Sequence, residues 1–214
     1  MVVGEIMLGI WIARALNSKI KGKTFFRAWF FFPAVLSGLT VALIFKQLFN
    51  YGLPAIGNAL GIEFLKTSLL GTNGGAIFAA IFVLLWQGVA MPIIIFLAGL
   101  QSIPAEITEA ARIDGANKFV TFYKVVLLIV APGIVATAIY TFINAWNEFL
   151  YALILINNTG KMTVAVALRS LNGSEILDWG DMMAASVIVV LPSIIFFSII
   201  QNKIASGLSE GSVK

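Results

Sequence analysis

The side chains in this sequence that could do chemistry are few, and three of them are charged and lie close together at 109–116, in the stretch EAARIDGA. Glu109, Arg112 and Asp114 form this block, and a long apolar segment lies on each side of it. The chain has no Cys and no His, which excludes thiolate nucleophiles, imidazole bases and the usual transition-metal ligands. Ion pairing with a partner is therefore the chemistry that we expect here, and we predict that the chain is not an enzyme.

A short surface helix is the element that must position this block. Ser102 is expected to N-cap the helix, with Pro104 in the first turn, where the missing N–H does no harm. Gly115 is expected to end the helix in a left-handed conformation, which costs glycine little. The sequence thus predicts one short helix inside the loop 101–124.

The faces of this helix differ in character. With 3.6 residues per turn, Ala110 and Ala111 share a face with Asp114, while Glu109 and Arg112 share another. A small-residue face lets another backbone approach closely, and a charged face can form ion pairs. The pattern fits a docking helix, and it fits equally an ordinary solvated loop with an i, i+3 ion pair between Glu109 and Arg112.

The composition places the chain in a membrane. Of its 214 residues 60% are hydrophobic and only 11% are charged, against about 25% charged in an average soluble domain. Helical spans need about 20 apolar residues each. We predict an all-α, polytopic membrane bundle forming a single transmembrane domain over 1–214, with five spans at about 1–16, 28–49, 75–100, 125–152 and 182–202.

The distribution of Lys and Arg gives the orientation. Cytoplasmic loops carry an excess of these residues, and most of them fall on one side of the predicted spans: Arg14, Lys19, Lys21, Lys23, Arg27, Arg112, Lys118, Lys124, Lys203 and Lys214. The other side has Lys46, Lys66, Lys161 and Arg169. The loop 101–124 and the C-terminus are thus expected in the cytoplasm. Because the basic residues are dispersed rather than gathered in one stripe, nucleic-acid binding is not expected.

A second polar cluster lies late in the fourth span. Planar hydrogen-bonding side chains and aromatic rings suit a sugar, and polar groups inside spans tend to mark pathways. We predict a solute pathway at Asn144, Trp146, Asn147, Glu148 and Tyr151. The alternative is an interfacial aromatic belt, which explains Trp and Tyr well and Glu148 least. Gln47 and Gln87 are further candidates for hydrogen bonds between helices, and Gln87 could equally line the pathway.

The motif EAARIDG, with the longer LAGLQSIPAEITEAARIDGA, resembles the cytoplasmic signature of permease subunits of binding-protein-dependent ABC importers, in the carbohydrate (maltose/glycerol-phosphate) branch. The resemblance implies that Glu109, Ala110, Ala111, Arg112, Asp114 and Gly115 dock onto a separate ATPase subunit. It also implies a second permease subunit, in a heterodimer or homodimer, and an extracytoplasmic solute-binding protein, for which the outer loop 170–181 is a weak docking candidate.

The resemblance places the chain in the inner (cytoplasmic) membrane, importing a sugar or related solute. No cofactor is expected in this chain, since it has no G-x-x-x-x-G-K-[ST] loop and the resemblance assigns ATP and Mg²⁺ to the ATPase. One rival is an ion-coupled secondary transporter, with Glu5 and Glu148 as candidate coupling carboxylates. The other is a membrane enzyme, which the missing Cys and His disfavour.

Three details depart from the family pattern. FFFPAVLSGLTVALIFKQLFN (30–50) resembles one of two partner permeases, whereas AWNEFLYALIL (145–155) resembles the other. Five spans leave the N-terminus outside, so either an upstream helix is missing or the chain is a shortened relative of six-span proteins. The family usually continues I-x-L-P nine residues after the motif glycine, but here these positions read VVLL (125–128) and proline comes only at Pro132, so we expect a less sharply bent helix after the loop.

Overall fold

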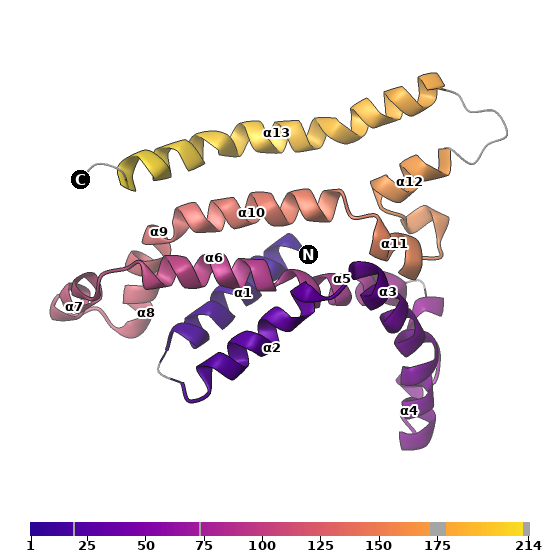
Figure 1. Ribbon diagram of the computed structural model, residues 1–214, viewed down its shortest axis with the longest axis horizontal. Helices are drawn as coiled ribbons and strands as arrows, with labels where there is room; N and C mark the ends of the chain where they lie inside the picture. The colour runs from indigo at the N-terminus through magenta and orange to yellow at the C-terminus, as the bar shows by residue number, and fades with distance from the viewer. Residues whose placement is uncertain (19, 73, 172–178, 212–214) are drawn as a thin grey trace. The chain divides into compact units, whose positions relative to one another are not determined.

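The computed structural model describes residues 1–18, 20–72, 74–171 and 179–211, and within these ranges it contains helices and turns but no strand. Figure 1 shows the succession of helices along the chain. The predicted all-α fold is confirmed. The chain divides into two compact units, and each is described by itself.

The first unit comprises Val35–Gln87 and Ile143–Ile195. It contains α3 (Gly38–Gln47), α4 (Leu53–Leu60), α5 (Gly75–Gly88), α11 (Leu150–Leu155) and α12 (Val164–Ser170). A π-helical turn, Leu48–Gly52, continues α3 directly into α4. Its core lies where α11 packs on α3 and α5, with Ala42, Val83 and Leu155 fully buried.

The second unit comprises Val2–Ala34, Gly88–Phe142 and Phe196–Lys214. It contains α1 (Val2–Asn17), α2 (Lys23–Val35), α6 (Ala90–Gln101), α7 (Ala105–Ile113), α8 (Lys118–Thr121), α9 (Leu127–Ile129) and most of α10 (Ala131–Trp146). A π-helical turn, Phe122–Val126, joins α8 to α9.

The closest packing in the second unit is between α1 and α6. Glu5, Gly9, Ala13 and Leu16 form the buried stripe of α1, spaced three or four residues apart. A methyl group on Gly9 would lie 2.7 Å from Cβ of Pro92, so only glycine permits this approach. Small residues at a helix contact let two backbones come close where no hydrophobic effect drives association.

Among the described residues, the single helices long and apolar enough to cross a bilayer are Gly38–Leu60 and Trp179–Ile199. Two broken pairs, Gly75–Gly88 with Ala90–Gln101 and Lys118–Ile129 with Ala131–Trp146, would raise the number to four. The predicted span 28–49 is not one helix, because α2 ends at Val35 and α3 begins at Gly38. The number of spans stays a prediction.

The helix after the loop is sharply bent, although the missing family proline favoured a weaker bend. The helical segment Lys118–Ile129 meets α10 at an angle of 67°, with the break at Val130. Pro132 explains the break, because it has no N–H to donate and its ring would clash with the carbonyl of Leu128 in a continuous helix. A proline placed a few residues later in sequence thus still bends the chain sharply.

The last helix, α13, runs from Trp179 to Gly211 and is longer than the predicted span 182–202. Phe196 of α13 stacks on Phe142 of α10, with ring centroids 4.0 Å apart. Other apolar side chains of α13, such as Ile188 and Ile195, are more than half exposed. Such a surface suits contact with lipid or with another membrane helix.

Candidate functional site

The charged block lies on α7, and α7 and α8 lie together beyond the end of α6 (Figure 1). The start of α7 differs from the prediction. Pro104, with φ −59° and ψ 141°, is the N-cap residue, while Ser102 still belongs to the end of α6 and its hydroxyl donates to the carbonyl of Gly99 at 2.9 Å. Ser102 keeps a helical backbone, so it cannot cap the following helix.

The end of α7 agrees with the prediction. Gly115 has a φ of +82°, and no atom lies within 4 Å of where its Cβ would be. The N–H of Gly115 donates to Arg112 and that of Ala116 to Ala111, at 3.0 and 2.9 Å. Asn117 then caps α8 by accepting from the N–H groups of Phe119 and Val120. The sharp reversal at Gly115 therefore has a defined direction.

The surface of α7 is largely open. Only Ala111 is buried, whereas Glu109, Ala110 and Arg112 are exposed. A hollow of about 510 Å³ is lined by Ala105, Thr108, Glu109, Arg112 and Ile113, and Ile113 is 81% exposed. Within the described part of the chain Glu109 and Arg112 form no ion pair with each other, so the i, i+3 pair of the solvated-loop alternative is not made.

The predicted pathway cluster contains a buried carboxylate with a local role. Glu148 is 9% exposed and precedes α11. Its two oxygens accept the N–H groups of Tyr151 at 2.7 Å and Ala152 at 2.9 Å. These N–H groups belong to the first turn of α11 and have no partner inside that helix. Glu148 thus caps a helix, a role that neither of the two sequence interpretations contained.

Two more members of the cluster join helices within the first unit. Tyr151 is buried, and its hydroxyl donates to the side-chain oxygen of Gln87, whose amide nitrogen donates to the carbonyl of Leu36 at 2.9 Å. The prediction of an inter-helix hydrogen bond for Gln87 is confirmed. Trp146 donates its indole N–H to the carbonyl of Val189 at 2.9 Å.

The two asparagines of the cluster differ from the other three residues. Both are exposed: Asn144 lies in the last turn of α10, and Asn147 directly follows the end of that helix. The structure therefore divides the predicted set into Glu148, which caps α11, Trp146 and Tyr151, which hydrogen-bond across helices, and two exposed asparagines.

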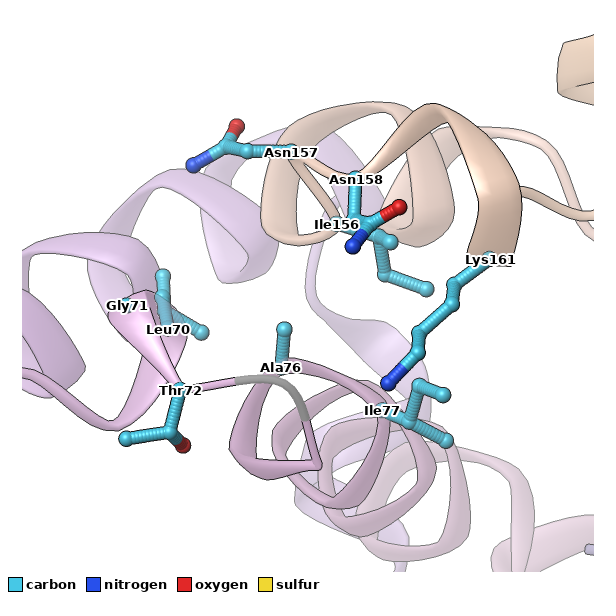
Figure 2. Close-up of a pocket in the computed structure, with 9 residues that line it drawn as sticks. All are labelled: Leu70, Gly71, Thr72, Ala76, Ile77, Ile156, Asn157, Asn158 and Lys161. Atoms are coloured by element: carbon cyan, nitrogen blue, oxygen red, sulfur yellow. The ribbon is translucent and has the colours of Figure 1, made fainter.

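Sequence reasoning missed a polar pocket of about 410 Å³ in the first unit. Figure 2 shows Lys161 and Asn158 reaching from the turn after α11 toward Ala76 and Ile77 of α5, with Thr72 on the near side. The signal was present as the run NNTGK (157–161) between apolar segments. Of the outer loop 170–181, residues 172–178 lie outside the described ranges.

Comparison with known proteins gives a consistent result. The family model described as "Binding-protein-dependent transport system inner membrane component" matches residues 5–210. The multiple sugar-binding transport system permease protein MsmF of Streptococcus mutans is 75% identical over 134 residues, which are 63% of this chain and 46% of that protein. The inner membrane ABC transporter permease protein YcjP of Escherichia coli is 30% identical over 99% of this chain and 69% of its own length.

The chain spans about half the length of several of the curated relatives it matches. Among solved structures, a chain of a bacterial alginate ABC transporter, in complex with an alginate pentasaccharide-bound periplasmic protein, superposes with a TM-score of 0.77. The match covers 91% of this chain and 70% of that one at 15% identity. At that identity the likeness shows a shared fold.

Proposed function

Because the chain belongs to the family of binding-protein-dependent transport system inner membrane components, we propose that it is a permease subunit of an ABC importer for a sugar or related solute. It lies in the inner membrane, pairs with a second permease subunit and receives solute from an extracytoplasmic binding protein. The sugar class is supported by the names of similar permeases, such as the trehalose transport permease of Mycobacterium tuberculosis, 35% identical over 60% of this chain.

The observation that carries the proposal is the open surface of α7. In the described part of the chain Glu109 and Arg112 form no ion pair with each other, and Ala110 is exposed. The left-handed backbone of Gly115 fixes the direction in which the chain leaves the helix. We assign docking on the ATPase to Glu109, Ala110, Ala111, Arg112, Asp114 and Gly115. The ATPase subunit binds ATP and Mg²⁺, and α7 transmits its movement to the spans.

The solute pathway is best assigned to Asn144 and Asn147. Exposed amides that face a pathway between two permease subunits can hydrogen-bond to the hydroxyl groups of a solute. Glu148, Tyr151 and Trp146 support this surface from behind by fixing α11 and α10. The pocket in Figure 2 lies on the predicted extracytoplasmic side, where a binding protein would approach.

The test is substrate-stimulated ATP hydrolysis in the reconstituted complex. Glu109→Lys should abolish stimulation and weaken co-purification of the ATPase while the chain still accumulates in the membrane. Glu106→Lys is the matched control, because Glu106 is an exposed carboxylate of the same helix that does not line the hollow. Equal stimulation in both variants and in the wild type would reject the docking assignment.

One observation favours the ion-coupled carrier. Glu5 is 2% exposed, and its Oε1 has no hydrogen-bond partner in the described residues, where it packs against Gly88. Buried carboxylates of this kind couple ion movement in secondary carriers. Uptake into vesicles driven by a proton gradient without ATP, and lost in Glu5→Gln, would support the carrier. Strict dependence on ATP would support the importer.

A further inference from the structure

A second pocket in the second unit lies beside α7 and shares Thr108 and Arg112 with the hollow described above. It has a volume of about 330 Å³ and is formed where the ends of α1 and α6 meet α7 and the segment after α8. Three cations line it, Arg14, Arg112 and Lys118, together with the apolar side chains of Leu100, Phe122 and Val126.

The charge of this pocket is unbalanced. Its lining contains no carboxylate, and within the described part of the chain none of the three cations has an ion pair or a hydrogen bond. Three like charges gathered at one hollow repel each other unless an anion lies between them. The pocket therefore has the electrostatics of an anion site.

Arg14 is held in a geometry that suits such a site. Its guanidinium stacks on the ring of Phe122, with the Cζ atom 4.2 Å from the ring centroid, and Trp11 lies at 5.7 Å. Stacking uses the flat face of the group and leaves the N–H fork at its edge for a ligand. Arginine binds phosphate in this way, with two parallel hydrogen bonds.

The position of the pocket selects the kind of anion. Arg14 is in the last turn of α1, at the end that the Lys and Arg distribution places in the cytoplasm. The inner leaflet is rich in anionic phospholipids, and basic pockets between helices on this side bind their head groups. The apolar residues Leu100, Phe122 and Val126 suit the glycerol and the first carbons of a lipid.

We propose that this pocket binds a phosphate group, carried by an anionic phospholipid of the inner leaflet. The phosphate bridges Arg14 at the end of α1 to Arg112 on α7 and Lys118 at the start of α8. A bound lipid thereby fixes the orientation of α7 relative to α1, which goes beyond docking on the ATPase. The inference depends on the orientation of the chain and not on which solute is carried.

The experiment titrates the purified membrane complex containing the full chain with phosphatidylglycerol or phosphatidylcholine and follows bound lipid by native mass spectrometry. Each cation near an anionic head group contributes about fivefold in affinity, so Arg14→Gln with Lys118→Gln should weaken phosphatidylglycerol binding by about 25-fold. Lys118→Gln alone, at an exposed position, should give about fivefold. Phosphatidylcholine binding should not change.

Two controls accompany the titration. Lys124→Gln removes a cation of the same loop that does not line the pocket, and Arg14→Lys keeps the charge. Lys124→Gln should bind phosphatidylglycerol within about twofold of the wild type, because it leaves the site intact. Arg14→Lys keeps the charge but loses the stacked N–H fork, so its binding should fall below that of the wild type and stay above that of the double variant. Equal binding in the double variant and in Lys124→Gln would overturn the lipid assignment.

Inorganic phosphate distinguishes the source of the group. If inorganic phosphate raises the melting temperature of the wild-type complex but not of the double variant, while lipid binding is equal in both, the site takes soluble phosphate and the phosphate chemistry stands. If neither lipid nor phosphate distinguishes them and the double variant instead loses the ATPase, a protein carboxylate occupies the pocket and the proposal is wrong. Either result leaves the test of the importer function unaffected.

Discussion

Glu109 and Glu148 are both glutamates in polar clusters that interrupt apolar sequence, yet their surroundings differ. Glu109 lies exposed on α7, where its neighbour Arg112 forms no ion pair with it in the described part of the chain. Glu148 is buried, and two backbone N–H groups of α11 satisfy its oxygens. The same residue type thus serves an external contact in one region and a helix end in the other.

The comparison shows what distinguishes a site from a structural feature. A carboxylate whose hydrogen bonds are complete inside the chain has little left to offer a partner, and removing it leaves donors unsatisfied. Glu109 is exposed beside Arg112 and the apolar side chain of Ile113. A contact that stabilises this carboxylate must therefore come from another molecule. Mutation of Glu109 should therefore affect binding to a partner, whereas mutation of Glu148 should affect the stability of the fold.

The largest effect is expected for Glu109→Ala. If Glu109 meets a basic group in a largely desolvated cleft of the ATPase, its loss should weaken ATPase association by about 2–5 kcal/mol. The folded stability of the chain should change by well under about 1 kcal/mol, because the side chain is exposed. The measurement is the dissociation constant of the ATPase from the membrane complex, with thermal melting as the check on folding.

Glu148→Ala should show the opposite pattern. Loss of the acceptor leaves two N–H groups of α11 unsatisfied in a buried place, which costs about 1–3 kcal/mol of stability. ATPase affinity of the folded fraction should be unchanged. Glu148→Gln keeps one acceptor oxygen and should lose less. If Glu148→Ala melts like the wild type but alters solute preference, the capping role is wrong and the pathway interpretation returns.

Two glycines offer a matched comparison of the same kind. Gly115 and Gly61 both have positive φ, +82° and +71°, and open space around the position of a Cβ. Alanine in this conformation costs roughly 1–2 kcal/mol at either position. Gly61→Ala, at the end of α4, should lower the melting temperature only. Gly115→Ala should also reduce substrate-stimulated hydrolysis, because the exit of α7 is redirected; equal hydrolysis in both would contradict that role.

How far the sequence predicts these regions depends on whether the cause is local. The end of α7 at Gly115 was predictable because the left-handed preference of glycine needs no knowledge of the rest of the chain. Ser102 failed as a cap because α6 continues further than its apolar pattern indicates, so the serine still has helical backbone. The charges of EAARIDGA were predicted as a surface feature, and the structure leaves Glu109 and Arg112 exposed.

The division of the pathway cluster could not be predicted from the sequence. Whether Glu148 faces solute or caps α11 depends on a chain turn between Trp146 and Leu150, and apolar periodicity does not reveal turns of this length. Tyr151 finds Gln87 across a long sequence separation. The 67° bend at Val130 likewise comes from Pro132 acting on the preceding turn, which the family spacing did not suggest.

The smallest effect is expected for Tyr151→Phe, which tests whether the satisfied cluster is only structural. The substitution removes the hydroxyl that donates to Gln87 and keeps the aromatic ring. Hydrogen bonds between membrane helices contribute about 0.6 kcal/mol on average, and we expect a loss of that order. A double-mutant cycle with Gln87→Leu isolates the contribution, since Gln87 also donates to Leu36. Thermal melting of the complex measures it, and uptake kinetics should stay at the wild-type level.

Asn147→Ala is the matched variant at the exposed amide surface and should change uptake without changing the melting temperature. Altered uptake in Tyr151→Phe together with normal uptake in Asn147→Ala would reverse the assignment and place the solute beside the buried cluster.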